Sequence, residues 1–170
     1  MLKEIVERRA CRKFNPNKKI TKEDLDKIVQ AGLLAPSAMN KQEGVVIVIT
    51  NKEIRDKLAN INKGNWDIPD PFYGAPVIIL VASKKSQYAD VDGACMLENM
   101  MLEATHLGIN SIWIHRAKEE LENEEAKSLL SSTGLNLDEY QGVGHLALGY
   151  SDGFEPAPKI IKDNRKFFIE

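Results

Sequence analysis

The chain has 170 residues, of which 43% are hydrophobic and 28% are charged, and its formal net charge is −2. This composition is ordinary for one soluble globular domain over residues 1–170, and the near-neutral charge argues against a dedicated nucleic-acid-binding protein. The longest apolar stretch, residues 75–82, is far shorter than the roughly 20 residues that cross a bilayer. Because the N-terminus also lacks an apolar signal region, we expect a cytoplasmic protein with no membrane partner.

The first part of the chain is predicted to form two helices before its first strand. Apolar residues at helical spacing begin at Leu2, and this helix ends in a basic run before Asn15-Pro16-Asn17. Thr21 begins a capping box, and the apolar stripe that follows it continues to Leu33. The β-branched run Val45–Ile49 then predicts a buried strand.

Helices and strands alternate in the rest of the chain. Helices are expected around residues 54–61, 90–107 and 119–131, and strands over 76–82, 111–114 and 143–149. The strand 76–82 is apolar on both faces, and the helix 90–107 is expected to be buried nearly all round, with Cys95 as a small core residue. The acidic residues 119–125 predict a solvated helix face.

The order of these elements predicts the α+β class with an α/β-like alternation, in which helices cover a mixed central sheet. The tail 154–170 ends in Phe167-Phe168-Ile169, which an extended segment cannot bury by itself. We therefore expect this tail to add to a sheet edge or to reach a partner subunit.

No metalloprotease, CxxC, P-loop, dinucleotide-binding or nucleophile-elbow motif occurs in the sequence. The three histidines, His106, His115 and His145, have no metal-ligand spacing. If the protein is an enzyme, the difficult chemistry therefore belongs to a bound cofactor.

Two polar segments in the first quarter of the chain are candidates for ligand binding. Arg8, Arg9 and Arg12 can present forked donors to a phosphate, although a basic run also suits the end of a helix. In residues 35–42, small side chains would let the backbone approach a flat ligand, with Ser37 and Asn40 offering hydrogen bonds. The alternative is an ordinary loop between a helix and a strand.

Two further candidates lie nearer the C-terminus. A buried strand runs directly into His115 and Arg116, and ligands of α/β folds favour the carboxyl ends of strands. The alternative there is a surface loop. Lys159 and Lys162, with Arg165 nearby, could supply a further cation, although lysines in a tail are usually solvated.

Taken in chain order, these segments resemble the FMN-dependent nitroreductase family. Residues 8–14 match a run of the form RRSxRxF, and residues 35–42 match a loop of the form APSxxNxQ. Residues 74–79 match a GAP-V-I-I strand, and Asp92-Gly93-Ala94 fall in the long central helix. A strand that leads into the flavin loop and a last strand ending in Gly149-Tyr150 complete the order, so the likeness covers nearly the whole chain.

The resemblance implies a homodimer with two identical FMN sites at the subunit interface. Arg8 and Arg12 would hold the phosphate and ribityl end, and Arg9 and Ala10 would lie beside the pyrimidine edge. Backbone at His115 and Arg116 would face the N5 and O4 region of the flavin. The isoalloxazine would be lined by residues of the partner subunit, namely Pro36, Ser37, Met39 and Asn40.

The sequence departs from the family pattern at three places. Ala10 replaces a serine, His115-Arg116 replaces a pair that usually contains glycine, and the basic pair of the tail is matched only loosely by Lys159 and Lys162. The first departure removes a hydroxyl contact, and the second bears on the backbone conformation beside the flavin.

The activity implied by the resemblance is electron transfer from NADH or NADPH, through FMN, to a small acceptor such as a nitroaromatic compound or a quinone. Donor and acceptor would use one site in turn, which predicts ping-pong kinetics. Three alternatives stay open: a flavin reductase or reductive dehalogenase with a different lid in residues 64–73, a non-catalytic protein that stores or senses FMN, and a dimeric scaffold without a cofactor.

Overall fold

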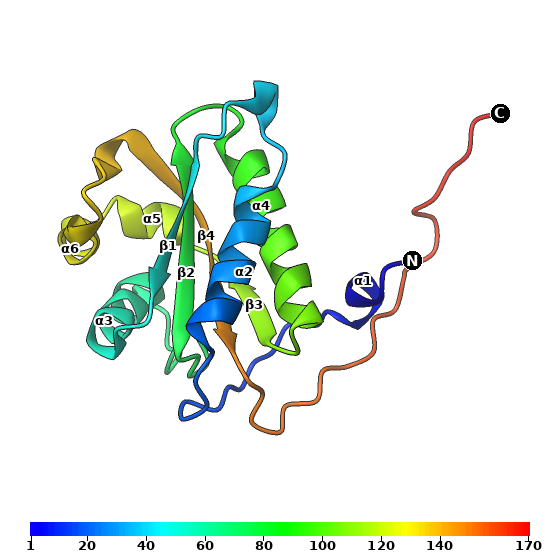
Figure 1. The fold of residues 1–170 in the computed structure, drawn as a ribbon, viewed down its shortest axis with the longest axis horizontal. Coiled ribbons are helices and arrows are strands. Elements are labelled where there is room, and N and C mark those ends of the chain that lie inside the picture. The colour runs from blue at the N-terminus through cyan, green and yellow to red at the C-terminus, as the bar shows by residue number, and fades with distance from the viewer.

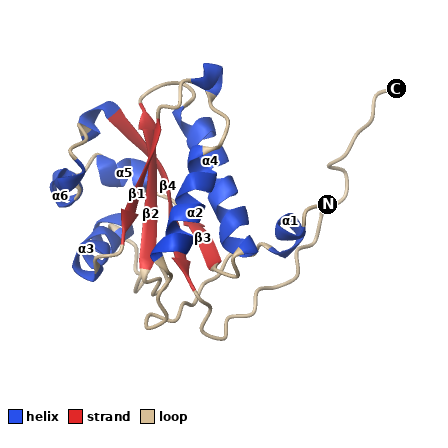
Figure 2. Ribbon diagram, viewed as in Figure 1, coloured by secondary structure: helices blue, strands red, loops and turns tan.

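A computed structural model describes all of residues 1–170. Helices lie on both faces of a four-stranded sheet (Figures 1 and 2). The strands are β1 (Gly44–Ile49), β2 (Val77–Lys84), β3 (Asn110–Ile114) and β4 (Tyr140–Gly149). The helices are α1 (Lys3–Glu7), α2 (Lys22–Leu33), α3 (Lys52–Lys63), α4 (Ala89–His106), α5 (Ala117–Leu121) and α6 (Glu124–Leu129), and short 3-10 turns cover Ala38–Asn40, Ser131–Thr133 and Leu137–Glu139. The predicted α+β class is therefore confirmed.

Neighbouring strands pair antiparallel in the order β1-β2-β4-β3, so the expectation of a mixed sheet is wrong. β2 and β3 do run in the same direction, as the alternation of helices and strands suggests, but β4 inserts between them. The long loop after α3 returns the chain to the end of the sheet where β1 finishes, so Thr50 and Pro76 line the same cavity. The one parallel contact is an isolated bridge between Ala10 and Ser111.

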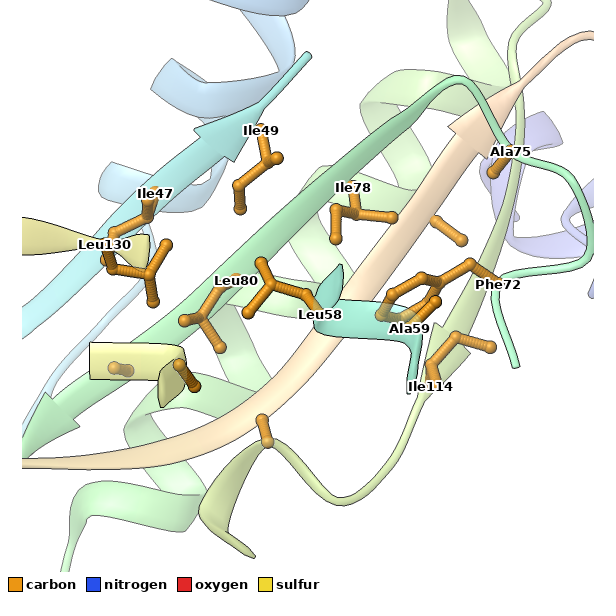
Figure 3. Packing of buried hydrophobic residues seen from close by; sticks show 14 of the residues in the cluster. Ile47, Ile49, Leu58, Ala59, Phe72, Ala75, Ile78, Leu80, Ile114 and Leu130 are labelled. Carbon is orange, nitrogen blue, oxygen red and sulfur yellow. The ribbon is translucent and has the colours of Figure 1, made fainter. Parts of the chain in front are cut away.

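β2 is buried on both faces, as its apolar run predicts. Its odd-numbered residues from Val77 to Val81 pack in a core with residues of α2 and α4, such as Ile28 and Leu97. Its even-numbered residues pack in the opposite core, and Figure 3 shows Ile78 and Leu80 there beside Leu58 of α3 and Phe72. The central strand thus holds both helical layers to the sheet.

Hydrogen bonds of single side chains determine where two of the helices begin. Thr21 Oγ1 accepts from the Asp24 amide at 3.1 Å, which confirms the capping box before α2. The single helix expected over 119–131 is wrong, because Asn123 Oδ1 accepts from the amides of Glu125 and Ala126 and begins a new helix, α6.

α4 has 18 residues, yet neither it nor any other helix has the length and apolar character needed to cross a membrane. One of its faces packs on the sheet and on α2, and the other is open to solvent, so the expectation of burial nearly all round is wrong. Cys95 and Val91 lie on this open face. The apolar tip of the C-terminal tail is also exposed, and the tail does not add to the sheet edge of its own chain.

We predict that Gly93→Ala destabilises the protein, although alanine is the better helix former by about 1 kcal/mol. A Cβ at position 93 would lie 2.5 Å from Val143 Cγ2 and 2.9 Å from Val143 Cβ. Because β4 cannot easily move away, the overlap should outweigh the propensity and lower the free energy of unfolding by about 1–3 kcal/mol, measured by urea denaturation.

The matched control is Gly32→Ala in α2, where a new Cβ would meet the flexible Met100 side chain, with Cγ at 2.8 Å and Sδ at 3.0 Å. Since this thioether can adopt another rotamer, the loss should be smaller than at position 93. A Gly93→Ala variant as stable as the unsubstituted protein would contradict the packing described here.

Candidate functional site

The arginine-rich segment that follows α1 runs beside the edge strand β3. Ala10 forms its parallel bridge with Ser111, and the Cys11 amide donates to the Ser111 carbonyl at 3.0 Å. Upstream, α1 is tied to the last turn of α4 by a 2.9 Å hydrogen bond between Glu4 Oε1 and His106 Nδ1. This bond lowers the pKa of Glu4 from its ordinary value of 4.5.

The three arginines of this segment differ in their partners. The Arg9 guanidinium donates to the carbonyls of Val6 at 2.7 Å and Arg8 at 2.8 Å, so it caps the C-terminus of α1. The guanidinium groups of Arg8 and Arg12 make no ion pair and no hydrogen bond within the chain. They are therefore two free cations on a segment that the sheet holds in place.

A small cavity of about 160 Å³ lies between this segment and the start of β3. Arg8, Arg9 and Ala10 line one side of it, and Ser111 lines another. Ser111 is only 2% exposed, and its Oγ has no hydrogen-bond partner. An unpaired buried hydroxyl is costly, so this atom is suited to a polar ligand group entering the cavity.

The loop expected to contact a flat ligand has an unusual backbone. Met39 and Asn40 have φ of 54°, and Gln42 has φ of 53°. The left-handed conformation is tolerated by asparagine but is strained for methionine. Such strain persists only where surrounding contacts enforce it, and it is concentrated at functional sites.

Hydrogen bonds to neighbouring side chains hold this loop in its conformation. The Ala38 amide donates to Asp92 Oδ1 at 3.0 Å, at the beginning of α4, and the Gln42 amide donates to Ser37 Oγ at 2.9 Å. Pro36 and Ser37 line a cavity of about 230 Å³, whereas the Met39 side chain is 72% exposed. The loop thus presents a fixed, outward-facing surface.

The loop and the arginine segment lie at opposite ends of α4 (Figure 1). The loop is bonded to Asp92, and the arginine segment shares its cavity with Thr105. Asp92 and Thr105 are 13 positions apart on the α-helix, which corresponds to a distance of about 20 Å. One chain therefore does not bring its own Pro36–Asn40 loop to its own Arg8–Arg12 segment.

The turn between β3 and α5 is clamped to the end of α3. Arg116 has φ of 71°, and its Nη1 donates to the carbonyls of Asn62 at 2.7 Å and Lys63 at 2.9 Å. The same guanidinium lies 5.4 Å from the ring centre of Trp66. In return, Asn62 Nδ2 donates to the His115 carbonyl at 2.9 Å. The Arg116 side chain is thus engaged with α3.

The amide groups of this turn remain free. Neither the His115 nor the Arg116 N–H donates to another group of the chain. Successive unpaired amides next to a left-handed residue form the kind of concavity that binds a negatively charged or hydrogen-bond-accepting group. Both amides are therefore available as donors, and the expected backbone contact at this position stays a prediction.

Behind the turn lies a buried polar group that the sequence did not indicate. Glu120 and His145 are 1% and 0% exposed, with His145 Nε2 3.0 Å from Glu120 Oε1 and 3.1 Å from Oε2. The prediction that Glu120 lies on a solvated face is therefore wrong. The signal in the sequence that indicates burial of Glu120 is its position between Ala117 and Leu121, which are both core residues. Gly142 allows β4 to pack closely against the start of α5, because a side chain there would overlap the Ala117 carbonyl.

The tail lysines are not brought to the site within one chain. Phe154 and Pro156 line the cavity beside Arg8, but the chain beyond them is extended and exposed. Lys159 and Lys162 lie in this exposed part and make no ion pair.

The free groups fit the chemistry of flavin mononucleotide. Arg8 and Arg12 can take a phosphate, Ser111 Oγ and the Ala10 backbone can meet a polar edge, and the two amides of the turn can donate to ring acceptors. Ala10 pairs with Ser111, four residues before His115, so the donors extend over about 13 Å of β3. The cavity of about 160 Å³ is smaller than the roughly 300–1,000 Å³ that usually encloses a ligand.

Comparison with known proteins supports this assignment. A protein of Archaeoglobus fulgidus, provisionally named NADH dehydrogenase/NAD(P)H nitroreductase, is 33% identical over 117 residues, which are 66% of this chain and 66% of that protein. A provisionally named NAD(P)H nitroreductase of Staphylococcus saprophyticus is 33% identical over 85 residues, 50% of this chain and 37% of the relative. The matches therefore span about two thirds and about one third of these relatives.

Solved structures match over almost the whole chain. The nitroreductase of Bacteroides fragilis with bound FMN is 28% identical, with a TM-score of 0.87 over 98% of this chain and 97% of that one. The nitroreductase of Desulfitobacterium hafniense with bound FMN is 27% identical, with a TM-score of 0.77 over 100% of both chains. The model of the nitroreductase family matches residues 5–71 and 68–150. With this fold and this arrangement of donors, the chain belongs to the nitroreductase family.

Proposed function

We propose that this chain is a single-domain, FMN-dependent NAD(P)H oxidoreductase that reduces nitroaromatics, quinones or related electron-poor acceptors. The observation that carries the proposal is the row of unpaired donors along β3, from the Arg8 and Arg12 guanidinium groups to the His115 and Arg116 amides. The likeness to FMN-bound nitroreductases over nearly the full chain supports it. The name of the Archaeoglobus relative supports NADH or NADPH as the electron donor.

Different residues of the chain would hold the phosphate end and the ring end of the cofactor. Arg8 and Arg12 hold the phosphate end, with Lys159 and Lys162 of the tail as further cations. The backbone at Ala10 would lie near the pyrimidine edge, and the Arg9 guanidinium, which caps α1, would add positive charge there. The amides of His115 and Arg116 donate to acceptor atoms of the ring at the other end of β3. These contacts orient the ring without any side-chain acid or base.

A second copy of the chain would complete each site. The Pro36–Asn40 loop is held about 20 Å from the Arg8–Arg12 segment of its own chain. Met39, at 72% exposed, and Val91 on the open face of α4, at 58% exposed, are apolar groups that a partner can cover. In a two-fold dimer, Pro36, Ser37, Met39 and Asn40 of one copy would line the flavin held by the other.

In the mechanism, bound FMN supplies hydride and electron transfer between the nicotinamide and the acceptor. The chain contributes position and charge. Positive charge from Arg9 would favour negative charge at the adjacent pyrimidine edge of the cofactor, as fixed donors do in oxyanion sites. The partner's loop and the His115–Arg116 turn would leave one face open, which donor and acceptor would occupy in turn.

The first test is the cofactor itself. Protein purified without added cofactor should show flavin absorbance and release about one FMN per chain on denaturation. Arg8→Ala and Arg12→Ala should each weaken FMN binding by about tenfold or more, because each removes a charged donor to the phosphate. The control is Lys3→Ala, which removes a cation of α1 that is paired only with Glu7. A colourless protein that takes up no added FMN would refute the proposed function.

The shared site can be tested with mixed dimers of Arg12→Ala and Asn40→Gly chains. Glycine keeps the positive φ at position 40 and removes the side-chain amide. After unfolding and refolding together, half of the dimers should be mixed, and each of these has one intact site. About one quarter of all sites should then bind FMN with normal affinity. Binding no better than the average of the two separate variants would contradict a site that is shared between two chains.

Catalysis is tested by steady-state oxidation of NADH and NADPH with menadione as the acceptor. Because both substrates use one open face, reciprocal plots at several acceptor concentrations should be parallel, as expected for ping-pong kinetics. Intersecting lines would show that both substrates bind at once. A protein that binds FMN but oxidises neither nucleotide would instead be a non-catalytic flavin-binding protein.

A further inference from the structure

The buried Glu120–His145 pair has no role in the function proposed above, although its environment makes it an unusual feature. Both side chains lie within an apolar core, where His145 packs edge-on against Phe72 with ring centres 5.1 Å apart. Burying a carboxylate is unfavourable unless hydrogen bonds compensate it, and two apolar side chains could fill the same volume. A specific use of the carboxylate would explain its presence.

The hydrogen bonds of the pair define where its protons lie. His145 Nδ1 is buried and has no partner, so a proton there would be an unpaired donor. The arrangement with fewest unpaired donors puts the ring proton at Nε2, which donates to Glu120 Oε2 at 3.1 Å. Glu120 Oε1 lies 3.0 Å from the same nitrogen but has no hydrogen-bond partner. Glu120 Oε2 also lies 3.4 Å from Asn62 Nδ2, which places Asn62 next to the pair.

Asn62 connects this pair to the turn. It is 4% exposed, and its Nδ2 is 2.9 Å from the His115 carbonyl oxygen and 3.4 Å from Glu120 Oε2. The two hydrogens of one amide group can serve both acceptors. The carboxylate therefore orients the Asn62 amide, and the Asn62 amide holds the His115 carbonyl.

Holding this carbonyl fixes a donor on the opposite side of the same peptide unit. The His115 carbonyl and the Arg116 N–H belong to one planar group in which they point in opposite directions. With the oxygen directed at Asn62, the Arg116 N–H is directed away from α3. That N–H is one of the two free amides of the candidate site.

We propose that Asn62, Glu120 and His145 are positioning residues that fix the His115–Arg116 peptide for the cofactor. This inference rests on the proposed function, because it assigns the free amides of the turn to bound FMN. The network acts on the turn through Asn62 and touches no reacting atom. We expect the network to affect the rigidity of the turn and the affinity for FMN.

Two substitutions test the network from different sides. Asn62→Ala removes the donor to the His115 carbonyl. Glu120→Gln keeps the volume but replaces one acceptor by an NH₂ group. At the Oε2 position the NH₂ group faces both Asn62 Nδ2, which is a donor, and His145 Nε2, which must then move its proton to the unpartnered Nδ1. At the Oε1 position it is a buried donor where the carboxylate oxygen itself has no hydrogen-bond partner. Each arrangement leaves at least one buried N–H unpaired. The control is Asn60→Ala, an exposed asparagine of the same helix with no side-chain hydrogen bond.

The first readout is the NMR order parameter of the His115 and Arg116 amides in the cofactor-free protein. Rigid backbone gives about 0.85, and flexible backbone gives less than about 0.6. We expect the values to fall in Asn62→Ala and Glu120→Gln and to stay unchanged in Asn60→Ala. A turn that remains rigid in both network variants would overturn the proposal.

The second readout is the FMN dissociation constant, measured well below the melting temperature of each variant. We expect it to rise by about tenfold in both network variants, because misplacing a binding group by a fraction of an ångström is enough for such a loss. Lower thermal stability with a rigid turn and unchanged FMN affinity would show a merely structural role. If the unsubstituted protein binds FMN and both variants bind it equally well, only this inference fails. If the unsubstituted protein binds none, the proposed function fails with it.

Discussion

The insertion of β4 between β2 and β3 leaves β3 at the edge of the sheet, and the candidate site depends on that position. An edge strand has backbone groups without partners on one side. The segment after α1 uses part of this edge, where the Cys11 amide donates to the Ser111 carbonyl. The end of the strand passes directly into the turn at His115. A strand in the middle of the sheet could not offer both an open edge for the arginines and an open end for the amides.

Buried polar groups in this fold lie where irregular segments need to be fixed. Arg55, 8% exposed, donates from Nε to the Ala75 carbonyl at 3.1 Å and pairs with Asp70, whose other bonds hold the loop before β2. The Glu120–His145 pair lies behind the β3–α5 turn in the same way. Loops lack the regular bonds of helices and sheets, so side chains must supply the missing partners. The free-energy cost of desolvating such groups is offset by the hydrogen bonds that fix the backbone of these loops.

The sequence predicted the regular elements better than the way they meet. Apolar periodicity located β2 and its two buried faces, and the Thr21 capping box located the start of α2. Strand order is set by long-range packing, and so β4 between β2 and β3 could not be read from local patterns. The separation of the Pro36–Asn40 loop from the arginines also depends on the direction of α4.

Individual site residues show the same division. Arg8 and Arg12 were identified from composition and local order, and the structure leaves both free. The acidic run concealed Glu120, because a count of charges does not register that one carboxylate falls on the inner side of α5. His145 and Asn62 belong to other elements, and only the packing of β4 and α3 against α5 brings them to it. Contacts between residues of different elements, such as these, cannot be predicted from the sequence of one segment alone.

In the proposed two-fold dimer, folding, dimerisation and cofactor binding are linked equilibria. Each chain would supply the arginines of one site and the loop of another, which contact α4 at positions about 20 Å apart, so a lone chain would form only half of the contacts. Any ligand that binds the dimer but not the monomer shifts the monomer–dimer equilibrium toward the dimer by mass action. In this dimer the exposed apolar groups at Val91, Met39 and the tail would supply the association surface, and the left-handed loop would form one preformed side of the site. FMN affinity should accordingly depend on protein concentration wherever the dimer dissociates, a behaviour that a site contained within one chain does not produce.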